Sequence, residues 1–190
     1  MTERAPYSHN RSIAFLESMK RMHLTMLGKP EVNMDMRKWT TQDKKVSLEI
    51  AFEFAMFMHL GQLDKGGKPY IEHPIRVAEN VYSFPEKIVA LLHDCIEDTD
   101  LTLDDLSFHF PIEILRAVYS ISKHVDEPYT IYIRRVSINT IARRVKIADL
   151  KDNMSEKRWI FGKRDDSSSM WVRYSKALEF LKEMDGNTRR

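Results

Sequence analysis

The stretch Ala90-Leu91-Leu92-His93-Asp94-Cys95-Ile96-Glu97-Asp98-Thr99 places an imidazole and three carboxylates directly behind an apolar run. The residues just before His93 are apolar on every side of a helix, which predicts a buried helix from Glu86 to about Asp98. In such a helix Glu97 follows His93 by one turn and Asp98 follows Asp94 by one turn, so the four polar groups share one side. Buried charges are normally paired or bound to a metal, because burying one alone costs about several kcal/mol. The stretch therefore predicts half of a metal site.

Two residues from other parts of the chain are predicted to complete this site. His73 precedes Pro74, which is suited to the first turn of a helix, so we expect His73 at the helix cap in an extended conformation. Asp149 lies on the apolar side of a predicted helix over residues 141–154. Each also has a simpler interpretation: His73 as an ordinary capping residue, and Asp149 as half of a buried salt bridge to Lys146 or an arginine.

The composition is that of a soluble globular protein. The 190 residues are 43% hydrophobic and 31% charged, and with six glycines, seven prolines and little strand-like alternation they favour a single all-α domain. The net charge of +2 is too weak to indicate a nucleic-acid or membrane partner. No apolar run approaches the ~20 residues that span a bilayer. The single cysteine, Cys95, and a polar start without a signal-peptide pattern predict a cytoplasmic protein.

Helical periodicity and helix-ending residues divide the chain into a series of expected helices. They cover about residues 12–27, 41–61, 74–82, 86–98, 103–110, 112–123, 129–136, 141–154 and 170–184. Residues 129–136 could form a strand by composition, but their apolar positions favour a helix. His59 is expected to make structural hydrogen bonds rather than to bind a metal. We expect an N-terminal extension at residues 1–40 (the helix at 12–27 and a loop), a functional domain at 41–185 and a disordered tail at 186–190.

Two imidazoles and two carboxylates from three segments form the predicted ligand set: His73, His93, Asp94 and Asp149. Mixed nitrogen and oxygen ligands suit a borderline divalent ion such as Mn²⁺, Fe²⁺ or Zn²⁺ better than Ca²⁺. Such an ion makes a bound water lose its proton more readily and polarises a phosphoryl group. Glu97 and Asp98 are placed to hold or deprotonate that water.

Several motifs along the chain share the order found in one family. They are His59-Leu60-Gly61-Gln62, Lys65, Pro69-Tyr70-Ile71-Glu72-His73-Pro74, Ala90-Leu91-Leu92-His93-Asp94, Glu97-Asp98-Thr99, and Val145-Lys146-Ile147-Ala148-Asp149 with Asn153. From about Val46 to Asn153 the sequence resembles the hydrolase domain of RelA/SpoT homologues, within the HD phosphohydrolase superfamily. The resemblance includes the single-domain small alarmone hydrolases.

This resemblance implies an all-α HD-domain helical bundle with one Mn²⁺, or another divalent ion, at the four predicted ligands. It also implies that Glu97 and Asp98 organise the attacking water. Asn153 matches a residue near the substrate ribose and Lys65 a basic residue of the nucleotide pocket. We expect two further substrate contacts, from Lys146 and Tyr129.

The substrate implied by the resemblance is a phosphorylated nucleotide. The family reaction removes the 3′-pyrophosphate from guanosine tetra- or pentaphosphate, the alarmones of the stringent response, and gives pyrophosphate and GDP or GTP. Asp64 departs from the family, in which an arginine commonly stands there and packs on the guanine base. Asp152 and Ser155-Glu156 also differ from the more basic or hydroxyl-bearing residues usual after the Asp149 motif.

Two alternatives follow from these departures. The same metal centre could act on another nucleotide, such as an adenosine alarmone, a deoxynucleotide or NADPH. A non-catalytic nucleotide-binding or protein-interaction module is the third interpretation, but a pure binder would not need Glu97 and Asp98. The sequence does not indicate the oligomeric state.

Overall fold

The computed structural model describes residues 15, 17–18, 35–64, 66–155 and 169–188, and within these the chain is helical, with no strand beyond the isolated Leu63–Pro69 bridge. The helices are η1 (Met36–Lys38), α2 (Thr41–Met58), α3 (Glu72–Glu79), α4 (Phe84–Leu92), α5 (Cys95–Asp98), α6 (Leu103–Ser107), α7 (Ile112–Ile121), α8 (Tyr129–Ile138), α9 (Thr140–Asn153) and α10 (Ser169–Thr188). The prediction of an all-α fold is confirmed, including the helix over residues 129–136. The helix expected at residues 12–27 lies almost entirely outside the described residues.

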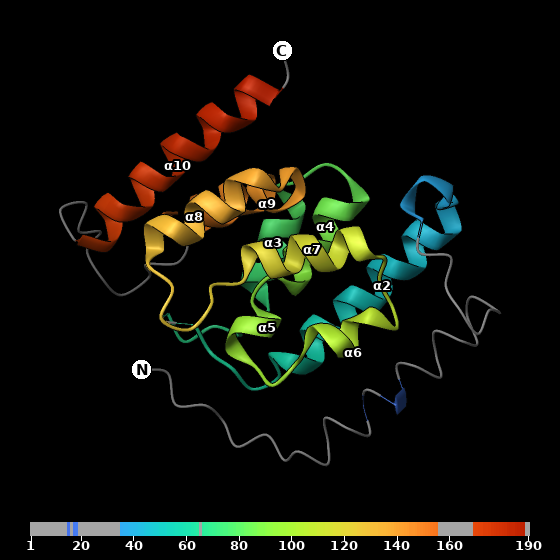
Figure 1. Cartoon of the computed structure of the whole chain (residues 1–190). Coiled ribbons are helices and arrows are strands. Elements are labelled where there is room, and N and C mark those ends of the chain that lie inside the picture. The colour runs from blue at the N-terminus through green and yellow to red at the C-terminus, as the bar shows by residue number, and fades with distance from the viewer. Residues whose placement is uncertain (1–14, 16, 19–34, 65, 156–168, 189–190) are drawn as a thin grey trace.

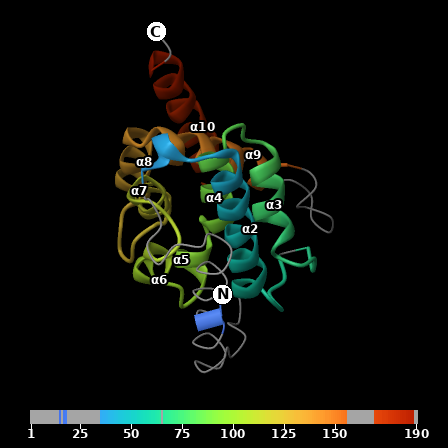
Figure 2. The same ribbon diagram turned by 90° about the vertical axis from the view of Figure 1, so that its right-hand side faces the viewer.

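Helix α4 lies at the centre of the bundle and packs against α2, α3, α7 and α9 (Figures 1 and 2). Its last five residues, Ile88 to Leu92, are all buried. A helix with neighbours on every side needs apolar residues on every side, which explains the unbroken apolar run. Within the described part of the chain, no helix combines the length and apolar character needed to cross a membrane.

Capping residues fix where three of the helices begin. The hydroxyl groups of Thr40, Ser83 and Thr102 accept the backbone N–H three residues ahead at the starts of α2, α4 and α6. In each case the carboxylate at that third position accepts a hydrogen bond from the backbone N–H of the cap residue, which completes a capping box. Each such cap stabilises its helix by about 1 kcal/mol. The cap at Ser83 therefore sets the register of α4 and the place where α4 delivers His93.

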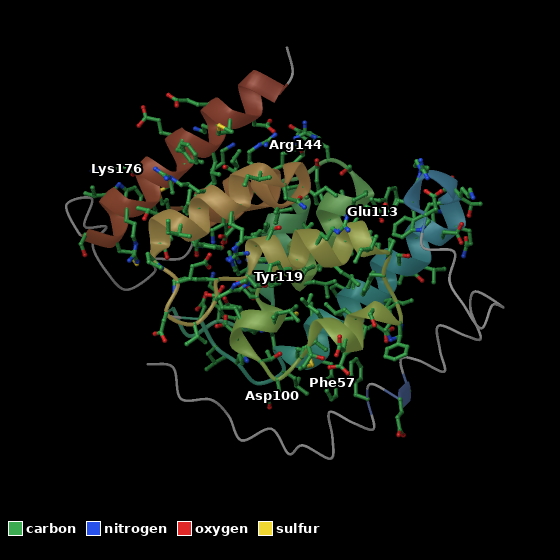
Figure 3. All side chains as sticks on the ribbon, in the orientation of Figure 1. Phe57, Asp100, Glu113, Tyr119, Arg144 and Lys176 are labelled. Carbon is green, nitrogen blue, oxygen red and sulfur yellow. The ribbon has the colours of Figure 1, made fainter. Side chains whose placement is uncertain are left out.

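The C-terminal helix is longer than the sequence suggested. Residues 186–190 were expected to be a disordered tail, but α10 continues through Gly186 to Thr188. The reason lies in Asp185, whose Oδ1 accepts hydrogen bonds from Arg143 and Arg144 of α9 at 3.1 Å each. Figure 3 shows Arg144 where α9 meets the C-terminal part of α10. This anchor offsets the roughly 1 kcal/mol that a helical glycine costs.

At the other end of the functional domain, α2 stops at Met58, before the expected end near residue 61. The backbone turns away through Gly61, which has a φ of +79° that favours glycine. The division into an N-terminal extension at residues 1–40 and a domain at 41–185 remains a prediction.

Candidate metal centre

The helix that carries His93 and Asp94 is interrupted at those two residues, so the prediction of one continuous helix from 86 to 98 was wrong. His93 Nδ1 donates to the backbone oxygen of Ala90 at 2.7 Å, and Cys95 Sγ donates to that of Leu91 at 3.7 Å. In a continuous helix these carbonyls would serve the backbone N–H groups of residues 94 and 95. Side-chain donors that compete for backbone acceptors favour such a break. It places both residues at the junction between α4 and α5.

His73 also lies differently from the prediction. It stands in the first turn of α3, not in an extended cap, and its backbone N–H donates to the oxygen of Tyr70 at 2.9 Å. Pro74 is compatible with this position because the first N–H groups of a helix have no intrahelical acceptor. The turn formed by Pro69 and Tyr70 thus leads directly into the helix and sets the imidazole of His73 at its start.

The structure brings the four predicted ligands together. His73 Nε2 lies 3.1 Å from Asp149 Oδ1 and 3.6 Å from Asp94 Oδ2. His93 Nε2 lies 3.2 Å from Asp94 Oδ2 and 3.7 Å from Asp149 Oδ1. One candidate ligand atom each from His73, His93 and Asp149 lie within 4.8 Å of one another, and all three residues are buried. Donors from α3, the α4–α5 junction and α9 therefore face one small volume.

The chemistry of this group fits a divalent cation. Nε2 of His93 is buried and has no hydrogen-bond partner among the described residues. Burial alone would lower the pKa of His93, but Asp94 and Asp149 raise it to about 9. Two neighbouring carboxylates, one buried and one half-buried, thus favour positive charge at this point, and two imidazole nitrogens beside them are suitable ligands. The His/Asp cluster is therefore suited to a divalent metal.

Asp149 also takes part in the salt bridge that was considered as an alternative. Lys146 Nζ lies 2.6 Å from Asp149 Oδ2, while Oδ1 of the same carboxylate faces the two histidines. Against the effect of burial, Lys146 and His73 hold the pKa of Asp149 well below its usual range. The salt bridge to Lys146 is thus present, and because it uses only one oxygen of the carboxylate, it leaves the predicted ligand role to the other oxygen.

Tyr129 is a predicted substrate contact. It is the first residue of α8 and lies near Lys146 of α9. Burial raises the pKa of Tyr129 to about 12, while the charge of Lys146 acts in the opposite direction. Its hydroxyl group is buried without a hydrogen-bond partner in the described part of the chain. Arg173 of α10 lies over the ring, with Cζ 4.7 Å from its centroid. A protonated phenol beside an ammonium group is a suitable donor to a phosphate oxygen.

The two predicted water-handling acids differ in their surroundings. Partial desolvation, with the nearby charges of Asp94 and Glu97, raises the pKa of Asp98 to about 6. Desolvation also raises the pKa of Glu97, whose Oε2 accepts the backbone N–H of Lys123 at 2.8 Å. Tyr70, to which sequence reasoning gave no role, connects Asp98 to the predicted ligand Asp94. Its hydroxyl group lies 2.6 Å from Asp94 Oδ2 and 3.3 Å from Asp98 Oδ2.

Comparisons with known proteins show what the chain is similar to. The chain is 29% identical over 151 residues to a guanosine-3′,5′-bis(diphosphate) 3′-pyrophosphohydrolase of Aquifex aeolicus. This match covers 73% of this chain and 22% of that protein. The chain is 32% identical over 120 residues to the human pyrophosphohydrolase MESH1, a match that covers 56% of this chain and 66% of that protein. A solved structure, described as a metazoan ortholog of SpoT that hydrolyses ppGpp, matches with a TM-score of 0.59 at 21% identity. That match covers 77% of this chain and 89% of the other, and it shows a shared fold. The chain belongs to the HD-domain family of RelA/SpoT homologues.

Family membership alone does not assign the relatives' activities to this chain, for two reasons. No protein-family model matches the chain. The chain also spans less than two thirds of the first relatives, for example 22% of the Aquifex protein and 16% of a probable GTP pyrophosphokinase of Mycobacterium leprae. The activities named for those RelA/SpoT homologues are therefore proposals for this chain.

The remaining predicted substrate contacts of the RelA/SpoT type lie partly within the described residues. Asn153 Nδ2 donates to Asp149 Oδ1 at 2.5 Å, which places its side chain at the metal centre. Lys65 lies outside the described residues. His59 makes structural hydrogen bonds, as expected: its Nδ1 lies 2.9 Å from Gln62 Oε1 and its Nε2 3.6 Å from Cys95 Sγ.

Two of the departures from RelA/SpoT homologues, at Asp64 and Asp152, have visible consequences. Asp64 Oδ1 accepts the backbone N–H groups of Gly66 at 2.8 Å and Lys68 at 3.0 Å, so it stabilises its own loop. Asp152 Oδ2 lies 2.7 Å from His73 Nδ1, and Arg76 donates to both carboxylate oxygens. Burial alone would raise the pKa of Asp152, but the contacts with His73 and Arg76 lower it to about 2. The one signal for Asp152 in the sequence is its departure from the family pattern, which did not predict its contact with His73.

Proposed function

We propose that this chain is a metal-dependent pyrophosphohydrolase that removes the 3′-pyrophosphate of (p)ppGpp-type nucleotides. Its resident cation would be Mn²⁺, held by His73, His93, Asp94 and Asp149. The observation that carries the proposal is the convergence of these four donors from three separate segments. Relatives at 29% and 32% identity that are named as enzymes of this activity support it.

The chain's own acids supply the proton transfers of the proposed reaction. When bound, a divalent cation lowers the pKa of a water ligand and polarises a phosphoryl oxygen. Asp98, with a pKa of about 6, is mostly ionised near neutral pH and is poised to accept the proton of the attacking water. Tyr70 holds Asp98 beside Asp94, and Glu97 completes the acidic side of the centre. The products are pyrophosphate and GDP or GTP.

Substrate groups would be positioned by residues around the acids and ligands. Lys146 and Tyr129 are suited to phosphate oxygens, because one is a cation and the other a protonated phenol. Asn153, bonded to Asp149, would meet the ribose next to the scissile bond. Lys65 would add a further cation to the nucleotide pocket.

Asp64 supports a second candidate function: the same chemistry on another nucleotide, such as an adenosine alarmone, a deoxynucleoside triphosphate or NADPH. A carboxylate cannot stack on a purine as a guanidinium does, and it repels phosphate. Moreover, Asp64 is engaged by the backbone of its own loop. The base would then be recognised by other contacts, and guanine would not be required.

The test is a hydrolysis assay of the full chain, with Mn²⁺ and then with Mg²⁺, Zn²⁺ or Co²⁺. Its substrates are ppGpp, pppGpp, ppApp, deoxynucleoside triphosphates and NADPH. Release of pyrophosphate from ppGpp, lost in Asp94→Ala and Glu97→Ala, is the expected result. Turnover of other nucleotides without ppGpp would select the second candidate. No turnover of any of these substrates would overturn both.

A further inference from the structure

The two histidines of the metal centre are held from behind by different kinds of acceptor. Nδ1 of His93 lies 2.7 Å from the backbone oxygen of Ala90, and Nδ1 of His73 lies 2.7 Å from Asp152 Oδ2. A carbonyl and an ionised carboxylate have no proton to give, so both Nδ1 atoms donate. In the neutral imidazole, the lone pair is then on Nε2, which faces Asp94 and Asp149 in both rings.

Asp152 is itself fixed in place. Arg76 Nε lies 2.8 Å from Asp152 Oδ1, and Arg76 Nη2 lies 3.1 Å from Asp152 Oδ2. This two-pronged pairing restricts the rotation of a carboxylate more than a single contact does. The side chains of His73 and Asp152 are only 2% and 8% exposed, so water competes weakly for these bonds. Arg76 and His73 both belong to the short helix α3, whereas Asp152 belongs to α9.

We propose that Asp152 is a positioning residue that holds His73 in the tautomer and orientation needed to bind the metal. The inference rests on the proposed metal-dependent function and adds a residue outside the predicted ligand set. An anionic acceptor behind a histidine also makes its other nitrogen a stronger ligand. His93 obtains its orientation from the main chain, whereas His73 depends on a side chain that substitution can remove. Loss of such an outer partner typically costs about 10–100-fold in metal affinity.

A purely structural role is the alternative, since the Arg76–Asp152 pair also joins α3 to α9. Asp185 provides a matched control, because its carboxylate likewise accepts from arginines, here Arg143 and Arg144. It is buried to a similar degree, with its side chain 12% exposed, but in the described part of the chain its carboxylate bonds to these arginines and to none of the four predicted ligands. Asp152→Asn and Asp185→Asn therefore both weaken a helix–helix ion pair, and only the first alters the support of His73.

The experiment is a calorimetric titration of Mn²⁺ into the chelator-treated full chain, with melting temperatures measured on the metal-free proteins. Asp152→Asn should raise the Kd for Mn²⁺ by about 10–100-fold, and Asp185→Asn should leave it unchanged although its melting temperature falls. Arg76→Lys, which keeps the charge but loses the two-pronged pairing, should raise the Kd by a smaller factor. It also tests the inference if Asp152→Asn does not fold.

A second readout follows the imidazole itself. In the diamagnetic Zn²⁺-loaded protein, the Nδ1 proton of His73 should give a slowly exchanging NMR signal, assigned with His73→Gln and broadened in Asp152→Asn. An unchanged Kd for Mn²⁺ together with an unchanged His73 signal in Asp152→Asn would overturn the positioning role. A wild-type chain that binds Mn²⁺ but hydrolyses no nucleotide would refute the proposed function alone. A wild-type chain that binds no Mn²⁺ would overturn both.

Discussion

Lys146 Nζ and Asp149 Oδ2 lie 2.6 Å apart on the same helix, α9, and the other oxygen of Asp149 faces His73 at 3.1 Å. One carboxylate thus balances a largely buried ammonium group on one side and contributes to the metal centre on the other. The charge of Lys146 offsets part of the repulsion between Asp149 and Asp94 when no cation is present. The ion pair therefore helps the site to persist without metal.

Replacing Lys146 with methionine should destabilise the metal-free protein by about 3 kcal/mol, because it leaves Asp149 as a buried charge without its cation. The measurement is the free energy of unfolding in urea, with and without Mn²⁺. Added metal should recover part of the loss, since it supplies positive charge to the same carboxylate. Lys151→Met, at an exposed position of the same helix, should change the stability by less than about 0.5 kcal/mol. Equal effects of the two substitutions would contradict the importance of this pair.

Removal of the metal should lower both stability and activity. A ligand present at about 100 times its Kd stabilises the folded state by about 2.7 kcal/mol, so Mn²⁺ should raise the melting temperature and a chelator should reverse this. His93→Gln should abolish the shift because it removes one of the proposed ligands. His124→Gln, which alters a histidine packed on Tyr119 rather than one of the cluster, should retain it. A shift that survives in His93→Gln would show that Mn²⁺ binds elsewhere.

The sequence was sufficient to predict the features that depend on local pattern. The apolar run before His93 predicts a helix surrounded by others, and helical periodicity predicts the other helices of the bundle. The membership in an HD-type fold and the ligand set depended on motifs whose order alone carries information. The geometry agrees with the expectation that these ligands converge.

The features that could not be predicted depend on contacts between distant residues or on competition between bonds. Asp152 and His73 are separated by 79 positions, so no local pattern connects them. The break at His93 depends on whether its Nδ1 or a backbone N–H takes the carbonyl of Ala90, a balance that periodicity does not contain. The extension of α10 through Gly186 likewise depends on Asp185 reaching the arginines of α9.

The hydrolysis rate should depend on the ionisation of Asp98. The pKa of this carboxyl is raised to about 6, and only the ionised form can accept a proton, so kcat/KM should fall as the pH drops below about 6. Asp98→Asn should lower kcat/KM at pH 8 by about 10²–10⁴-fold and remove this acid limb. Profiles are measured at saturating Mn²⁺, with Glu97→Gln as the comparison: its residual activity should keep an acid limb, moved to lower pH because the charge of Glu97 helps raise the pKa of Asp98. A limb that persists in Asp98→Asn would assign it to another group.

Acid should weaken the ion pair between Glu127 and Arg135, whose charged atoms lie 2.6 Å apart. Glu127 stands two residues before α8, and Arg135 is in the last turn of that helix. Arg135 lowers the pKa of Glu127 from 4.5 to about 2, against a smaller effect of burial. Because the folded-state pKa is depressed, the stabilisation is complete above about pH 4.5 and is lost as the pH falls toward 2. Glu127→Gln should therefore cost at most about 1 kcal/mol at pH 7 and clearly less at pH 2. Melting temperatures across this range test it, with the exposed Glu179→Gln as a control that should match the wild type.

Substrate choice should respond to residue 64. Asp64→Arg introduces the guanidinium that other members of the family are expected to stack on guanine, so it should raise kcat/KM for ppGpp relative to ppApp. The substitution also removes the carboxylate that accepts from Gly66 and Lys68, and this loosens the loop. Asp64→Ala separates the two effects, since it loses the same loop contacts without adding a cation. An equal change in the ppGpp to ppApp ratio for both variants would mean that loop order, and not stacking, sets the preference.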